Sequence, residues 1–317
     1  MVEPLRALGT PFSCPQSPFF FQRSYCKMLS TPFLALVATA LAGLSTASEL
    51  HARNLVYRSP LAELPQLDID IEQLAKRSAG SKAYTGPLDF RYGVAAGDAD
   101  EKSAIIWSHP VPAQNVSELC LKYETSTSKT KFDKKSVVDS GEVKTTPDVD
   151  YSVKLETKHL KPKTQYYYRF TSCGNSSAVS PVGALKTTPS PNDASFDKAT
   201  MAVFSCSNFP NGFFGAYNQA EKRNKIDFWL HLGDFIYESY SKAPLAGPER
   251  QVMPAREIST LDDYRLRYKT YHTDAGLLAL RQNKASYVVW DDHEVADNAW
   301  KAGTADSNDT VAGEVNG

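Results

Sequence analysis

Hydrophobic and polar residues alternate in short runs between positions 88 and 190. The runs are SAIIWSHP, SELCLKYET, DYSVKLE, TQYYYRFTS and VGALKTTP, and polar turns separate them. Alternation with a period of two residues is typical of strands that bury one face. Several short strands without helical segments between them predict an all-β sandwich over residues 88–190. We expect Trp107 and the tyrosines 166 to 168 to be residues of its core and sheet faces.

The pattern changes after TTPSPNDASFDKA, a stretch rich in Pro, Ser and Asn that we interpret as an interdomain linker. From residue 196, apolar strands are predicted in TMAVFSCSN, IDFWLHLGD and ASYVVWDD, and helices in GAYNQAEKRN and TLDDYRLRYKTYHTDAGLLALRQ. Alternation of strands with helices predicts βαβ units and a largely parallel sheet. Ser259 and Asp262 fit a capping box at the start of the longer helical segment.

The N-terminal part of the chain is interpreted as a targeting region. Residues 28–47 contain a short apolar run followed by small residues, which is typical of a secretory signal peptide. Residues 1–27 do not fit that pattern, and we interpret them as a spurious extension; residues 48–87 are interpreted as a linker or pro-segment. A membrane anchor is the alternative, but the run is shorter than the roughly 20 apolar residues of a span. Secretion, to the extracellular space or cell wall, is therefore expected.

Composition and charge exclude some classes of protein. The 317 residues allow about two domains. The formal net charge of -1 and the lack of a long Lys/Arg block argue against nucleic-acid binding and against a polybasic membrane patch. The oligomeric state stays open at this point.

Three cysteines follow the predicted signal peptide, and an odd number in a secreted chain leaves one thiol for another purpose. Cys120 and Cys173 both lie in strand-like runs and are possible disulfide partners, although no spacing rule requires the pair. Cys206 is then unpaired. Candidate glycosylation sites are present at Asn115, Asn175 and Asn308.

The three strands predicted after the linker all end in polar side chains. Cys206 follows the first strand, Asp234 the second, and the sequence DDHE, residues 291–294, the third; Tyr237 comes three residues after Asp234. Because the carboxyl ends of parallel strands meet at one edge of a sheet, we expect these side chains to lie together. A thiol, a phenol, carboxylates and an imidazole suit a hard or borderline cation such as iron, zinc, manganese or calcium. The combination predicts a metal site, although each residue alone also fits packing or a turn.

Taken together, the quoted motifs resemble the alkaline phosphatase D (PhoD-type) family of calcineurin-like metallophosphoesterases. The likeness covers roughly residues 88–300, from FRYGVAAGDADEKSAIIWSHPVP through FSCSN and HLGDFIYE to VVWDDHEVADN. The resemblance implies a fibronectin III-like all-β sandwich at 88–190, followed by the N-terminal part of an α/β metallophosphoesterase domain (an αββα sandwich) at 196–317. It also implies a phosphoric ester hydrolase whose substrates are small phosphate mono- or diesters.

The resemblance also assigns roles to single residues. Asp234 corresponds to an aspartate that bridges two metals, Tyr237 and Cys206 to ligands of a ferric ion, and Asp292 to a further metal ligand. His293 corresponds to the catalytic histidine, and the second metal is implied to be calcium. Asp291 and Glu294 are expected to support the ligands from outside the metal shell.

The sequence also departs from the family pattern. The family supplies further strands and a second group of His and Asp ligands, whereas this sequence ends at TVAGEVNG shortly after the third motif. We therefore expect an incomplete fragment with little or no phosphatase activity of its own. The alternative is a secreted, glycosylated binding protein in which the β-domain functions and the catalytic half is vestigial. An oxidoreductase that uses the iron has no support beyond the ligand types, and the particular phosphoester stays open.

Overall fold

The computed structural model describes residues 47–223, 225–300 and 303–304. The predicted signal peptide except for Ala47, the N-terminal extension and Asn308 lie outside these residues. Among the described residues, no helix combines the length and the apolar character needed to cross a bilayer.

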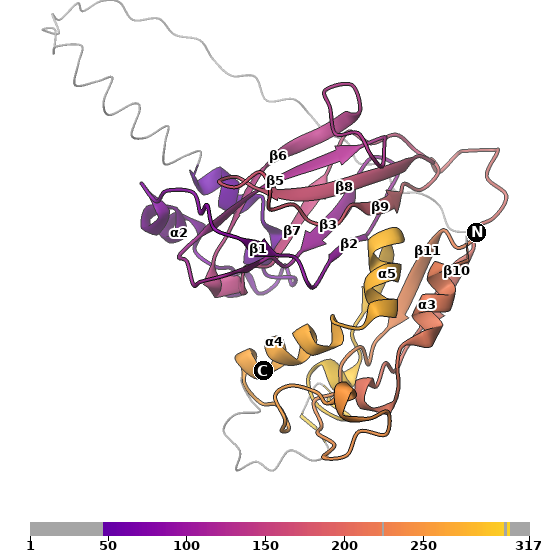
Figure 1. Ribbon diagram of the computed structural model, residues 1–317. Coiled ribbons are helices and arrows are strands. Elements are labelled where there is room, and N and C mark those ends of the chain that lie inside the picture. Colours follow the sequence, from indigo (N-terminus) through magenta and orange to yellow (C-terminus); the bar gives the residue numbers. More distant parts are fainter. Residues whose placement is uncertain (1–46, 224, 301–302, 305–317) are drawn as a thin grey trace, which may run out of the picture. The chain divides into compact units, whose positions relative to one another are not determined.

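Three sheets make up the β-structure of the described residues (Figure 1). A four-stranded antiparallel sheet has the order β6 (Val137–Thr145), β5 (Leu119–Ser126), β8 (Gln165–Ser172) and β9 (Gly183–Lys186). A six-stranded mixed sheet has the order β10 (Met201–Phe204), β11 (Phe228–Leu232), β12 (Ser286–Val289), β2 (Val94–Gly97), β3 (Ala104–Ser108) and β7 (Val153–Thr157). β1 (Leu88–Asp89) pairs with β4 (Val111–Pro112).

The helices are short. The labelled α-helices are α2 (Ile71–Ser78), α3 (Gly215–Glu221), α4 (Leu261–Tyr271) and α5 (Ala275–Asn283), and residues 47–52 are helical as well. Single 3-10 turns are η1 (Leu55–Tyr57), η2 (Pro65–Leu67), η3 (Pro147–Val149), η4 (Phe209–Asn211), η5 (Pro248–Arg250) and η6 (Asp292–Glu294).

One hydrophobic core joins the four-stranded sheet to strands β2, β3 and β7. Ile106 of β3 and Leu155 of β7 are buried in the same cluster as Leu121 of β5 and Phe170 of β8. Each of these strands alternates buried with more exposed residues, as a strand with one buried face does. Residues 88–190 therefore form two β-layers around a shared core (Figure 1).

The strands after residue 196 extend the same sheet. β10, β11 and β12 pair in parallel, and β12 meets β2 through the single pair Ser286 and Gly97. The six-stranded sheet thus contains strands from both sides of the predicted linker.

Helices cover one face of these parallel strands. Trp229 of β11 is buried with Tyr217 of α3, Tyr271 of α4 and Leu280 of α5. The predicted capping box at the start of α4 is wrong by one residue: the side chain of Thr260 accepts the hydrogen bond from the Asp263 amide. Thr260 has the extended backbone of an N-cap, and its hydroxyl is in reach of the third amide of the helix.

The opposite face of the parallel strands is apolar and exposed. Met201 and Val203 of β10, Leu232 of β11 and Val289 of β12 point to this side, and each is about half exposed. Strands of parallel sheets are ordinarily buried on both faces, so their sequences are continuous apolar runs. This explains why the sequences of these strands do not alternate between apolar and polar residues.

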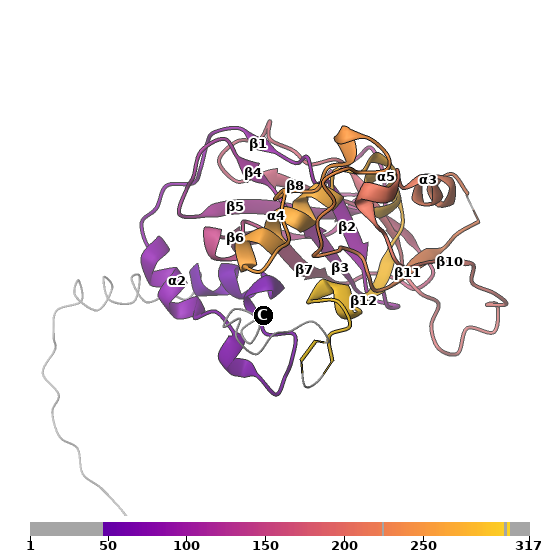
Figure 2. The ribbon, with the colours of Figure 1, turned by 90° about the horizontal axis from the view of Figure 1, so that it is seen from below.

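The interpretation of residues 48–87 as a linker is wrong for much of this segment. His51, Asn54, Tyr57 and Leu74 are all buried, and the last two form a small core with Val149. Asn54 donates to the carbonyls of residues 144 and 152 and accepts from the amide of residue 154. Figure 2 shows α2 near β6. A few large apolar side chains in a polar background are sufficient to attach this segment to the β-layers.

Candidate metal centre

The loops after β10, β11 and β12 bring the predicted site residues together. Cys206 follows β10, Asp234 follows β11, and Asp292 and His293 lie in η6 directly after β12. Hydrogen bonds join the first two loops, since the Cys206 amide donates to the Gly233 carbonyl at 3.2 Å and the Ser207 amide donates to the Asp234 carbonyl at 2.8 Å. The parallel register therefore places all three loops at one edge of the sheet, as the sequence predicts.

The backbone at this edge is strained. Cys206 has φ 57° and Asp234 has φ 53°, in the left-handed region that side chains other than glycine seldom adopt. Gly233 has φ 93°, and a Cβ there would lie 2.4 Å from the backbone nitrogen of Asp291. Only glycine allows the β11 and β12 loops to approach this closely. Strain of this kind concentrates at functional sites.

The side chains form one cluster around the Asp234 carboxylate. Ligand atoms of Asp234, Asp292 and His293 all lie within 4.8 Å of one another. Asp234 Oδ2 accepts from the Cys206 thiol at 3.5 Å and from the Tyr237 hydroxyl at 3.2 Å. All five residues predicted as metal ligands or as the catalytic histidine are therefore neighbours.

The cluster fits a cation. Asp234 Oδ1 is buried and has no hydrogen-bond partner among the described residues, and a buried carboxylate oxygen without a donor is costly unless a cation binds it. Burial and the adjacent Asp234 and Cys206 raise the pKa of Tyr237 above its ordinary value. A bound cation would reverse that trend by stabilising the phenolate. Asp234, Asp292, Cys206, Tyr237 and His293 could hold such an ion.

Glu238 orients His293, and the sequence analysis missed this residue. Its Oε2 lies 2.8 Å from His293 Nδ1, and its Oε1 accepts the Asp297 amide at 3.0 Å. Glu238 is almost fully buried. Burial alone would lower the pKa of His293, but the hydrogen bond to Glu238 and its charge raise it. An acidic residue directly after Tyr237 was the only signal in the sequence for this contact.

Glu294 fastens the β11 loop to the β12 loop. Its two carboxylate oxygens accept hydrogen bonds from the amides of Asp234, Phe235, Ile236 and Asp291, at 2.5 to 3.3 Å. Four charge-assisted hydrogen bonds on one side chain hold the Asp234 backbone in its strained conformation. The Asp291 backbone takes part in the same contact and lies against Gly233. Both residues thus touch the loops that supply the ligands.

The remaining predicted residues lie away from this cluster. Cys120 and Cys173 form a disulfide between β5 and the end of β8, with Cα atoms 5.4 Å apart, which leaves Cys206 of the metal cluster as a free, exposed cysteine. Asn115 is exposed, and Asn175 is partly buried with its amide near the Gly86 carbonyl.

The sequence of the chain matches a known class of phosphatases. Residues 201–316 match the PhoD-like phosphatase family, and residues 75–189 match the PhoD-like phosphatase N-terminal domain. These two ranges together span most of the chain, which therefore belongs to the PhoD-like phosphatase family.

Individual relatives agree with this assignment. Alkaline phosphatase D of Bacillus subtilis (strain 168) is 34% identical over 215 residues, which cover 66% of this chain and 36% of the relative. A solved structure of PhoD aligns with a TM-score of 0.60 and 33% identity, over 69% of this chain and 41% of that one. The chain thus spans well under half the length of these relatives.

Proposed function

We propose that this chain takes part in the metal-dependent hydrolysis of small phosphate mono- or diesters. The observation that supports the proposal is the cluster of Cys206, Asp234, Tyr237, Asp292 and His293 around an unpartnered, buried carboxylate oxygen. Membership of the PhoD-like family favours this reaction over the oxidoreductase alternative.

The donor types suggest which metals the residues would hold. Cys206, Tyr237 and Asp234 supply sulfur, phenolic and carboxylate donors, which suit a ferric ion, whereas Asp292 supplies an oxygen ligand that suits calcium. Asp234 contacts Cys206 and Tyr237, and its ligand atom lies within 4.8 Å of that of Asp292, so it is the candidate bridge. Cations bound here would neutralise phosphate charge and lower the pKa of a bound water.

His293 is the proposed proton donor to the leaving alkoxide. The Glu238 carboxylate is the hydrogen-bond partner of His293 Nδ1. The other ring nitrogen, Nε2, is therefore the atom that can face a substrate oxygen. Asp297 Oδ1 now lies 3.5 Å from Nε2, and the substrate oxygen would replace it as the partner. The raised pKa of His293 favours the protonated ring that such a step needs.

Metal binding and turnover test the proposal separately. We expect Asp234→Asn to lower the affinity of the 317-residue chain for Ca²⁺ or Mn²⁺ at least tenfold by calorimetry, because the substitution removes a central ligand. Asp262→Asn is the matched control, since that side chain is 93% exposed. Equal affinity of Asp234→Asn and the parent chain would contradict the metal site.

Hydrolysis of p-nitrophenyl phosphate and bis(p-nitrophenyl) phosphate measures the reaction itself. We expect weak turnover, because among the described residues the second cation would have Asp292 and the bridging Asp234 as its ligands, whereas hydrolysis in two-metal enzymes needs both cations firmly bound. Substantial turnover that Asp234→Asn abolishes would support the reaction and contradict the expected low activity. A stability unaffected by chelator and by Cys206→Ser would instead favour the β-domain binding protein.

We also propose that the chain passes through the secretory pathway. The Cys120–Cys173 disulfide supports an oxidising compartment, and the exposed Asn115 is accessible to glycosylation. Expression of the chain with residues 28–47 retained, in a secreting eukaryotic cell, tests this proposal. We expect cleaved protein in the medium, with a glycan that Asn115→Gln removes; retention of the uncleaved chain inside the cell would contradict it.

A further inference from the structure

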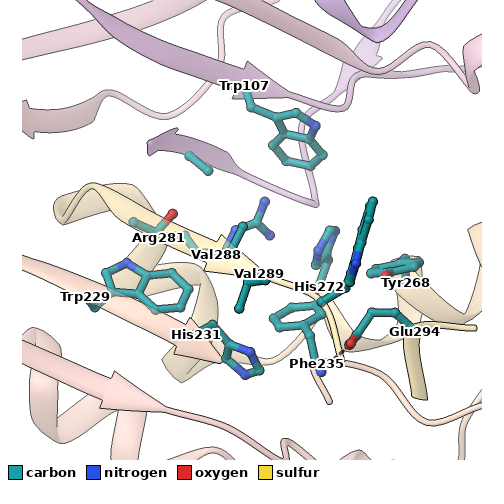
Figure 3. A pocket seen from close by; sticks show the side chains of 13 residues that line it. Trp107, Trp229, His231, Phe235, Tyr268, His272, Arg281, Val288, Val289 and Glu294 are labelled. Carbon is teal, nitrogen blue, oxygen red and sulfur yellow. Dashed lines mark hydrogen bonds between the residues drawn. The ribbon is translucent and has the colours of Figure 1, made fainter. Parts of the chain in front are cut away.

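An aromatic cavity of about 610 Å³ lies beside the parallel strands. Trp107 of β3, Trp229 of β11, Phe235, and Tyr268 of α4 contribute rings to its wall. Figure 3 shows Trp107 on one side of the cavity and Trp229, His231 and Phe235 on the opposite side. The sequence analysis treated Trp107 as a packing residue, but its side chain is only partly buried and faces this space.

A buried positive charge lies in this wall. Arg281 of α5 is 7% exposed, and its Nη1 is buried without a hydrogen-bond partner among the described residues. Its guanidinium lies 4.6 Å from the centre of the Trp107 ring. Burial lowers the pKa of Arg281 to about 10, which still leaves the group protonated at neutral pH.

No carboxylate among the described residues that line the cavity is free to neutralise Arg281. Glu294 is the acidic residue in that lining, and its oxygens already accept four backbone amides. Tyr168 is the neighbouring group that favours the charged form of Arg281. Burial raises the pKa of its phenol, so Tyr168 is uncharged at neutral pH and cannot neutralise the arginine. An unpaired charge in a low-dielectric site is costly, so an anionic partner would be bound with a large electrostatic gain.

The two histidines of the cavity are not charged competitors for that anion. Burial lowers the pKa of His231 to about 4, and burial together with the charge of Arg281 lowers the pKa of His272 well below its ordinary value. His231 Nδ1 is buried and has no hydrogen-bond partner among the described residues, whereas Nε2 contacts the Ser207 hydroxyl at 3.0 Å. The cavity therefore combines one cation, one unpartnered imidazole nitrogen and apolar rings.

We propose that this cavity binds a small organic anion that consists of a planar aromatic ring and a carboxylate. The ring would lie between Trp107 and Phe235, and the carboxylate would pair with Arg281. Aromatic walls with few polar groups are typical of sites for small organic ligands, and the guanidinium fork matches the geometry of a carboxylate. The residues that bind the charge and the ring lie outside the metal cluster, so the proposal does not depend on phosphatase activity.

Calorimetry with a matched pair of probes tests the proposal on the unaltered 317-residue chain. 2-Naphthoate has the ring and the charge, and 2-naphthylmethanol has the ring alone. We expect 2-naphthoate to bind at one saturable site at least tenfold more tightly than 2-naphthylmethanol. Equal binding of the two probes, or no binding of 2-naphthoate, would overturn the proposal without any need for a variant.

Substitutions then locate the site. We expect Arg281→Met to lower the affinity for 2-naphthoate at least tenfold and to leave that for 2-naphthylmethanol unchanged, whereas Trp107→Leu should weaken both probes. Arg91→Met is the control, because that arginine is more than half exposed and pairs with Asp89. Unchanged 2-naphthoate binding by a folded Arg281→Met chain would show that the anion binds elsewhere and would refute the assignment.

Discussion

The β-layers of residues 88–190 and the parallel strands after residue 200 use the two faces of a strand differently. In the β-layers, strands such as β3 and β7 bury one face in a shared core and leave the other face more exposed. In the parallel strands, helices cover one face and apolar side chains remain exposed on the other. The core of the first region consists almost entirely of its own side chains, with Ala285 added from the second. The second uses fewer packed faces, and its polar loops are fastened by specific hydrogen bonds such as those of Glu294.

The largest expected difference between the two regions is the cost of removing an apolar side chain. Ile106→Ala should lower the free energy of unfolding by about 2–5 kcal/mol, because Ile106 is fully buried between the β-layers. Val203→Ala, on the exposed face of β10, should change it by less than about 0.5 kcal/mol, since Val203 is 53% exposed. Urea unfolding measures both values. Similar costs at the two positions would show that the exposed face is covered in solution.

A smaller effect concerns the pH dependence of the free energy of unfolding, to which a buried carboxylate of the β-layers contributes. Glu118 lies 3.0 Å from buried His51 and 2.8 Å from Lys144. Burial alone would raise the pKa of Glu118, but these two partners lower it to about 2. The folded form therefore gains stability above the ordinary pKa of a glutamate, about 4.5, and loses it as pH falls toward 2.

Glu118→Gln should remove this pH dependence. The contribution is up to roughly 3 kcal/mol, so the parent chain should lose more stability than the variant between about pH 4.5 and 2. Acid titration followed by circular dichroism gives the comparison, with exposed Glu72→Gln as the control. Acid transitions that coincide for Glu118→Gln and the parent chain would contradict the role of this carboxylate.

The smallest expected effect is confined to the parallel-strand region. Glu294→Gln should weaken Ca²⁺ binding about 10- to 100-fold, because the amide cannot accept all four backbone hydrogen bonds and the Asp234 loop loses its support. The exposed Glu257→Gln should leave the affinity unchanged. Calorimetric titration measures the affinities. If Glu294→Gln binds Ca²⁺ as the parent chain does, the loop does not need this support.

The sequence predicted the structure best where a recurring pattern, an apolar run followed by polar residues, fits only one kind of element, a buried strand followed by a loop. The apolar runs before Cys206, Asp234 and Asp291 became β10, β11 and β12, and parallel pairing then placed the following loops together. Alternation likewise indicated β3, β5, β7, β8 and β9. The sequence analysis did not predict β6, whose residues VVDSGEVKT contain a glycine and several polar side chains and follow no regular alternation of buried and exposed positions.

Contacts between residues far apart in the chain could not be predicted in the same way. The position of Glu238 directly after Tyr237 does not reveal that it meets His293, 55 residues later, because that contact depends on how two loops fold. Asn54 and Tyr57 are similarly attached to positions about 90 residues away. Arg281 looks like an ordinary helix residue, and only tertiary structure shows that it is buried with no carboxylate partner in the part of the chain that the structure describes.

The junction between β12 and β2 has a consequence for cooperativity. The sheet passes from one region to the other through the single pair of Ser286 and Gly97, with side-chain support from the Tyr287 hydroxyl on the Ala99 carbonyl. A sheet joined over one residue can open at that joint while both sides keep their own hydrogen bonds. Opening at this joint also has to break the packing of α5 against β2 and β9 and the ion pairs Lys269–Asp150 and Lys186–Asp227. These contacts, together with the single strand pair, transmit a disturbance from one region to the other.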